Sequence, residues 1–91
     1  MASRDGDSDE VVAAVLRMLA EARQKREITL EQLAELSGVD HGIISRAERL
    51  QRIPGMAYIR DLAVSLDLDF ADLVRRAEDV VGKARSDKKR K

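Results

Sequence analysis

The chain has 91 residues and a formal net charge of zero, and it contains no cysteine and a single histidine. This length fits one small domain, and the lack of thiols excludes a disulfide framework and a thiolate metal site, so we expect no metal and no cofactor. No apolar run approaches the ~18 residues that a membrane span requires, and the acidic N-terminus is unlike a secretory signal. We therefore expect a cytoplasmic protein that makes no membrane contact, and no small-molecule ligand is evident.

Charge is unequally distributed along the chain. Residues 1–10 carry one basic and four acidic groups, a net charge of −3, whereas residues 83–91 carry six basic groups and one acidic group, a net charge of +5. Both ends lack periodic apolar residues, so we expect residues 1–8 and 83–91 to be disordered on either side of one domain at 9–82. The centre of the chain is slightly acidic, which is unusual for a DNA-binding module because neutralising phosphates supplies most non-specific affinity.

The first predicted helix runs from about residue 9 to about residue 25. Its apolar residues recur at helical spacing and are Val12, Val15, Leu16, Leu19 and Ala20. A second helix is predicted to begin after Thr29, because Gln32 three residues later completes a capping box. Ile28 and Leu33 occupy the two positions of a hydrophobic staple, which fixes how the chain enters this helix.

Three residues in the segment 29–50 fit a corner between two helices joined by a tight turn. Ala34 is small enough for a close approach, Gly38 can adopt the left-handed backbone without a Cβ penalty, and Ile44 can fill the space between the helices. Asp40 is expected to cap the second helix of this corner. The pattern predicts a helix-turn-helix whose second helix spans about residues 40–50.

Two further helices are predicted after this corner, which makes the fold class all-α with five helices. Pro54 and Gly55 interrupt the chain, and the next segment has apolar residues at helical spacing, namely Met56, Ile59, Leu62, Ala63 and Leu66. Asp69 is expected to cap the fifth helix. The apolar stripe of that helix includes Leu73, Ala77, Val80 and Val81. We expect the stripe to form a dimer seam, and the alternative is that it folds back on the first helix.

Residues 11–73 resemble the Cro/C1-type helix-turn-helix domain of phage repressors, also called the xenobiotic-response-element family. The resemblance rests on the segments ITLEQLAELSGVD and IISRAER, a following proline, and YIRDLAVSLDLDFADL. It implies a five-helix, phage-repressor-like fold in which Arg23 on the first helix pairs with Glu48 on the third, a contact that holds the domain together. It also implies that the helix at about 40–50 enters the major groove of double-stranded DNA.

The residues that the resemblance places at DNA are Thr29, His41, Gly42, Ile43, Ser45, Arg46, Arg49 and Arg52. Arg46 is the strongest candidate, because a guanidinium can donate two parallel hydrogen bonds to guanine O6 and N7; the alternative is a solvated helix residue. Arg49 and Arg52 are placed for phosphates. His41 either donates to a base or phosphate or is inert, and Ser45 either binds phosphate or bonds back to a carbonyl.

Several positions depart from the family pattern. Leu30 stands where a glutamine often braces the recognition helix, and Glu27 and Leu50 stand where glycines are usual, so the recognition helix is expected to run on or to end irregularly. Together with an exposed Ile43, Leu30 and Leu50 would place apolar groups on the DNA face, and such clusters more often signal a protein contact.

Two functions follow from these observations. The first is a sequence-specific DNA-binding regulator of a phage, plasmid, integrating element or restriction-modification-like locus, acting as a homodimer. The alternative is an antiactivator that binds a transcriptional activator protein through Leu30, Ile43 and Leu50. The sequence offers no paired nucleophile and base and no phosphate loop, so we expect no enzymatic activity.

Overall fold

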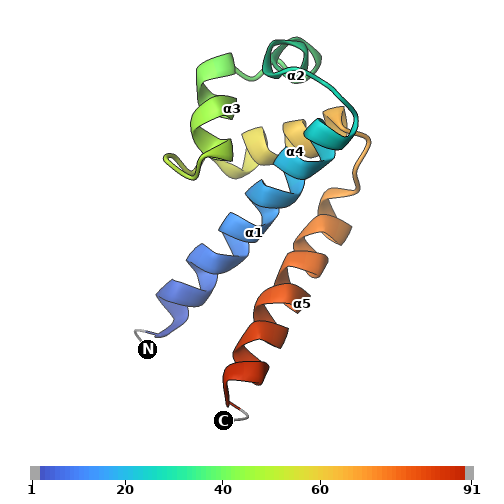
Figure 1. Cartoon of the computed structure of the whole chain (residues 1–91). Coiled ribbons are helices and arrows are strands. Elements are labelled where there is room, and N and C mark those ends of the chain that lie inside the picture. Colours follow the sequence, from blue (N-terminus) through green and yellow to red (C-terminus); the bar gives the residue numbers. More distant parts are fainter. Residues whose placement is uncertain (1–2, 90–91) are drawn as a thin grey trace.

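The computed structural model describes the backbone of residues 3–89 and the side chains of residues 8–87. This part of the chain forms five α-helices and no strand (Figure 1). The helices are α1 (Ser3–Lys25), α2 (Leu30–Ser37), α3 (His41–Glu48), α4 (Met56–Ser65) and α5 (Phe70–Lys89). The predicted all-α fold with five helices is therefore confirmed. No helix within residues 3–89 is long and apolar enough to cross a membrane.

The long helices α1 and α5 lie side by side and run antiparallel, and the three short helices gather at one end of this pair (Figure 1). The start of α1 and the end of α5 lie together at the opposite end. One apolar core joins the elements, and its largest fully buried side chains are Leu16, Leu33, Val39, Ile44, Leu66 and Leu73. Since these residues come from every helix or from the turns beside it, burial in this core holds α2 and α3 against the α1–α5 pair.

Each of the three predicted side-chain caps is present. Thr29 Oγ1 accepts from the Gln32 amide at 3.0 Å, and the Gln32 side chain accepts from the Thr29 amide at 2.8 Å, which completes the capping box. Asp40 Oδ2 accepts from the Gly42 amide at 2.9 Å, and the Asp69 carboxylate accepts from the amide three residues later at 3.1 Å. These local bonds fix where α2, α3 and α5 begin, because they satisfy amides that a helix start leaves free.

The corner between α2 and α3 has the predicted geometry. Gly38 has φ of 75°, in the left-handed region, and its amide donates to the Ala34 carbonyl at 2.9 Å. Ile44 is buried between the helices, as predicted. Ser37 contributes a feature that the sequence did not indicate, because its hydroxyl donates to the Leu33 carbonyl and accepts from the Val39 amide. The turn is therefore held by side chain and backbone together.

The recognition helix ends irregularly, which is one of the two outcomes expected from the sequence. Instead of running on, α3 ends at Glu48, and Leu50 adopts a left-handed backbone with φ of 58°. The Gln51 amide then donates to the Arg46 carbonyl at 2.8 Å, which satisfies an acceptor that the helix end leaves free. Glu27, the other position without the usual glycine, has φ of 56°. Both residues thus adopt a glycine-like conformation at a cost of roughly 1–2 kcal/mol each.

Both ends of the chain differ from the expected disorder. The first helix begins at Ser3 rather than near residue 9, and α5 passes through Gly82 and continues to Lys89. Once a helix is nucleated by its packed apolar face, each added residue gains a backbone hydrogen bond. Residues 1–2 and 90–91, for which disorder was also expected, lie outside the described residues.

The expectation of a dimer seam on α5 was wrong. Leu73, Ala77 and Val81 are 2%, 0% and 8% exposed within a single chain, because α1 packs along this stripe. Only Val80 remains open, with 54% of its surface exposed. The stripe therefore folds back on α1, the alternative that the sequence left open, and three of the four proposed seam residues belong to the core.

Candidate nucleic-acid interface

The recognition helix α3 has one packed side and one open side. Ile44 and Ala47 are buried, whereas His41, Arg46 and Arg49 are exposed. The helix lies at the edge of the molecule, next to α2 and away from α5 (Figure 1). Apolar burial on one side therefore holds a row of polar side chains toward solvent, as the predicted helix-turn-helix requires.

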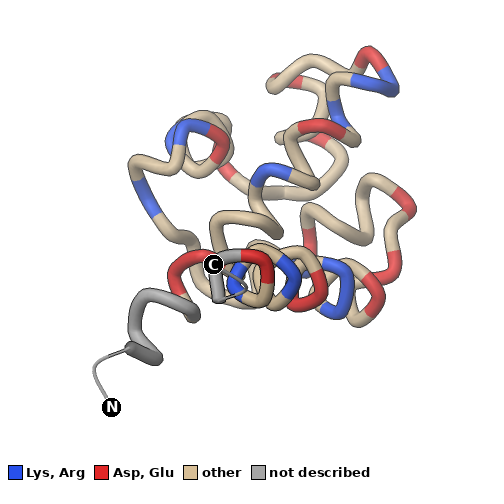
Figure 2. The backbone as a smooth tube through the Cα atoms, turned by 60° about the horizontal axis from the view of Figure 1, so that its bottom comes forward, with Lys and Arg blue, Asp and Glu red and all other residues tan. Residues whose placement is uncertain are grey.

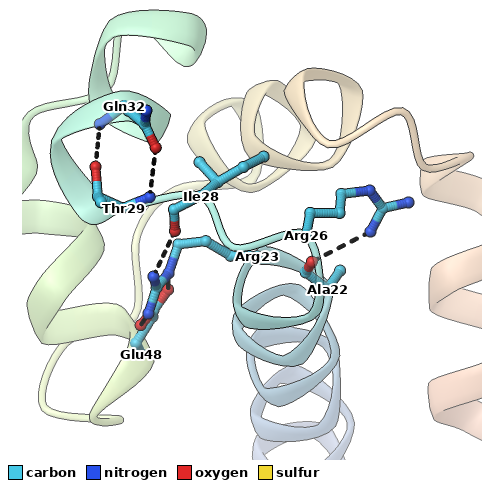
Figure 3. Close-up of polar contacts among 7 residues, drawn as sticks. All are labelled: Ala22, Arg23, Arg26, Ile28, Thr29, Gln32 and Glu48. Carbon is cyan, nitrogen blue, oxygen red and sulfur yellow. Dashed lines mark hydrogen bonds and ion pairs between the residues drawn. The ribbon is translucent and has the colours of Figure 1, made fainter.

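An ion pair anchors the C-terminal end of α3 to α1, as the family resemblance implied. Arg23 donates through Nε and Nη2 to the two carboxylate oxygens of Glu48, at 2.6 and 2.9 Å, and through Nη1 to the Ile28 carbonyl at 2.7 Å (Figure 3). The two side chains are only 14% and 16% exposed. The paired geometry therefore ties α1, the loop before α2 and the end of α3 together.

The electrostatics of this pair keep Arg23 charged. The hydrogen bond with Glu48 raises the pKa of the Arg23 guanidinium, burial acts in the opposite direction, and the charge of Glu48 adds to the increase. A raised pKa means that the folded chain holds this proton more tightly than the unfolded chain. With Glu48 ionised, the stabilising contribution of Arg23 is therefore fully present below the ordinary pKa of arginine and is lost as the pH rises through the raised pKa.

At the N-terminal end of α3, the side chain of Arg46 lies over Gly42. A Cβ atom built on Gly42 would be 3.5 Å from Nη2 of Arg46 and 3.0 Å from Oδ2 of Asp40. The space above Gly42 is thus bounded by the capping carboxylate and by the guanidinium. This Asp40 oxygen accepts a hydrogen bond from the Gly42 amide, which supports the interpretation of Asp40 as a helix cap.

Basic groups continue past the end of α3. Arg49 Nη2 donates to the Ser45 hydroxyl at 3.1 Å, and Arg52 is exposed in the loop before α4. Together with Arg46 they form an exposed row of three arginines. Between residues 8 and 82, the other Lys and Arg are interspersed with Asp and Glu (Figure 2), whereas residues 83–91 carry a net charge of +5. The arginine row is therefore a local concentration of positive charge on a molecule of mixed charge.

Thr29 is exposed at the start of α2, but its hydroxyl and its amide are both engaged with Gln32 (Figure 3). Exposed carboxylates follow on the same helix at Glu31 and Glu35. A capped, acidic helix start attracts phosphate less than an open one does. The role of Thr29 at DNA stays a prediction, and this geometry gives it little support.

Two of the three apolar residues expected on the DNA face are not free. Leu30 and Ile43 are half-buried and pack against the core, whereas Leu50 is 41% exposed. Both residues therefore contribute to the edge of the core rather than to a free apolar surface. The expected apolar patch is thus reduced largely to Leu50.

The structure adds an apolar hollow of about 280 Å³ that the sequence did not indicate. Its lining comes from α1, the segment before α4, α4 and α5, and comprises Val11, Val12, Val15, Ile53, Pro54, Met56, Ile59, Phe70 and Val74. Ile53 and Met56 are largely exposed, at 56% and 74%. Helical spacing does not predict this feature, because Ile53 and Pro54 lie outside the helices. The only sequence signal is the apolar pair on either side of Pro54 and Gly55.

An outward helix held across a second helix by a glycine turn defines a helix-turn-helix protein. The sequence model of the helix-turn-helix family matches residues 19–73, more than half of the 91 residues, so the chain belongs to the Cro/C1-type helix-turn-helix family. It is a DNA-binding transcription regulator by this membership. No curated protein and no solved structure matched the chain.

Proposed function

We propose that the protein is a sequence-specific DNA-binding regulator that places α3 in the major groove of an operator. The observation that carries the proposal is the outward face of α3, on which Arg46 is exposed while Ile44 and Ala47 anchor the helix. Arg46 reads guanine through paired hydrogen bonds, and Arg49 and Arg52 bind phosphates. The other predicted DNA contacts are Thr29, His41, Gly42, Ile43 and Ser45.

Because few basic groups face the DNA, we expect sequence-independent binding to DNA to be weak. Each chain offers about two arginines to phosphates, so a pair of chains should release about four counterions, giving a slope of about −4 in log affinity against log salt. The low charge fits a regulator that depends on base contacts, and we propose that it acts in the cytoplasm. A phage, plasmid, integrating element or restriction-modification-like locus is the setting we propose.

The partner in this proposal is a second copy of the chain, in contact across the apolar hollow. Ile53 and Met56 stand exposed on its rim, and uncovered apolar area of this kind commonly marks a protein contact. Ile53 lies in the segment 49–55 that follows α3 directly, and Met56 opens α4. A two-fold contact here is suited to hold two recognition helices about one DNA turn apart, ~34 Å.

Sedimentation equilibrium tests the homodimer. Met56→Asp should lower the measured mass toward that of one chain, because it buries a charge at the contact. Val64→Asp is the matched control, since Val64 is also exposed on α4 and lies outside the hollow. A monomeric wild-type protein, or a dimer that persists in Met56→Asp, rejects this placement.

The antiactivator alternative has less support. It requires an apolar face at Leu30, Ile43 and Leu50, and the first two of these are engaged with the core. A charged substitution at Leu50 should therefore leave a DNA-binding protein intact, whereas an antiactivator would lose its partner.

A titration at low salt tests the DNA function itself. The protein's own upstream region should bind more tightly than a scrambled duplex of the same composition, because base contacts add to the phosphate contacts. Equal affinity for the two duplexes would reject sequence-specific regulation. A regulator that then co-purifies with the protein, and is lost on Leu50→Asp, would favour the antiactivator.

A further inference from the structure

The guanidinium of Arg46 lies against residue 42, in space that a side chain longer than alanine at that position would enter. Residues 42 and 46 are four apart and therefore share one face of α3. Helical side chains lean toward the N-terminus, which carries the guanidinium of Arg46 back over Gly42. The Nη2 and Cζ atoms lie 3.5 and 3.9 Å from the position that a Cβ on Gly42 would take. These are ordinary contact distances, so the guanidinium fills the open strip.

The backbone does not explain the glycine. The only glycine with positive φ among the described residues is Gly38, so Gly42 has a conformation open to other residues. Within a helix, glycine is less favourable than alanine. Gly82 in α5 shows the contrast, because nothing lies within 4 Å of its Cβ position. Gly42 therefore has a specific neighbour to accommodate, and Gly82 has none.

We propose that Gly42 determines base specificity by positioning Arg46, an inference that rests on the proposed DNA function. The N-terminal part of a recognition helix reaches base edges, and the open strip brings the Arg46 donors to that part. A side chain longer than alanine at position 42 takes the place of the guanidinium and turns Arg46 away. Alanine is small enough to leave Arg46 in place, and its Cβ displaces only the Asp40 carboxylate by a few tenths of an ångström.

Selection from a random duplex library with the full chain tests this inference. Wild type should enrich a motif that contains a G·C pair, and Arg46→Ala should lose preference at that pair by roughly 5- to 150-fold. Gly42→Leu should lose preference at the same pair and leave the rest of the motif unchanged. Gly42→Gln should also lose it. Gly42→Ala is the matched control and should keep the wild-type motif.

Each outcome has a separate meaning. If wild type enriches a motif and Gly42→Leu and Gly42→Gln keep its G·C pair, the positioning role is rejected while the DNA function stands. Loss of the pair in Gly42→Ala as well rejects the mechanism, because the backbone at residue 42, not Arg46, would then approach the base. No enrichment by wild type rejects the DNA function. Circular dichroism and thermal unfolding confirm that each variant is folded, and the double variant Gly42→Leu/Arg46→Ala should lose no more preference than Arg46→Ala alone.

Discussion

The two ends of α3 are built in different ways. At its C-terminal end, Glu48 is largely buried and is held by two hydrogen bonds from Arg23. Toward its N-terminal end, the guanidinium of Arg46, a residue of the last turn, reaches back over Gly42, and Arg46 is exposed to solvent. The Glu48 end fixes the helix to α1, and toward the other end the Arg46 side chain is exposed to solvent. Stability and recognition should therefore respond to different substitutions in the same helix, although these residues are only a few positions apart.

The largest effect on stability is expected at the anchored end. Glu48→Ala leaves the Arg23 guanidinium largely buried without its carboxylate, and should lower the free energy of unfolding by about 2–3 kcal/mol. Urea unfolding followed by circular dichroism measures this loss. Asp72→Ala, which breaks an exposed pair with Arg75 and Arg76, should cost at most about 0.5 kcal/mol. Equal losses in the two variants would contradict the anchoring role.

On the exposed side of α3, Arg46→Ala should weaken DNA recognition and leave the free energy of unfolding unchanged. Loss of its paired hydrogen bonds should reduce discrimination between operator and scrambled duplex by about 1–3 kcal/mol, with an unchanged unfolding curve. Arg17→Ala removes the same charge from an exposed position on α1 and is the matched control. If operator affinity is unchanged in Arg46→Ala, the proposed division of α3 into an anchoring end and a DNA-recognition end is wrong.

A smaller effect of opposite sign is expected just beyond the anchor. Leu50→Gly should raise the free energy of unfolding by about 0.5–1 kcal/mol, because glycine relieves the left-handed strain but gains freedom in the unfolded chain. Asp67→Gly, at a residue with similar φ, should gain less because aspartate tolerates this conformation better. A destabilised Leu50→Gly variant would show that the Leu50 side chain packs usefully.

The smallest effect should come from salt on DNA binding. With about two phosphate contacts per chain, the slope of log affinity against log salt should stay near −4 for a pair of chains. Arg52→Ala should reduce its magnitude by about 2 in a dimer, one phosphate contact from each chain, and leave sequence preference unchanged. Fluorescence anisotropy at four salt concentrations measures both slopes.

The local features of the fold were predictable because their causes are local. The capping box at Thr29, the cap at Asp40 and the left-handed Gly38 each depend on residues within a few positions, and each is present. The partner of an apolar stripe is not local. Leu73 and Ala77 could equally have met a second chain, and only the packing of α1 along α5 decided the matter.

The sequence predicted the helix that carries the site, but it did not predict which of its neighbouring side chains are exposed. Exposure of Arg46 followed from its position opposite Ile44. The burial of Leu30 and Ile43 depended on the angle between α2 and α3, which no sequence spacing gives. The contact between Arg46 and Gly42 required side-chain rotamers. The usual glycine of the family at position 50 indicated that an irregular helix end was one of two outcomes, but it did not predict that a leucine would adopt the left-handed conformation itself.

The antiparallel pairing of α1 and α5 has a practical consequence. The chain enters α1 and leaves α5 at the same end of the molecule, remote from α2 and α3 (Figure 1). A fluorophore, affinity handle or fused activation module attached at either end should therefore stand clear of bound duplex. We expect fusions at either end to bind duplex DNA as the unmodified chain does, which makes the protein convenient to follow in a living cell.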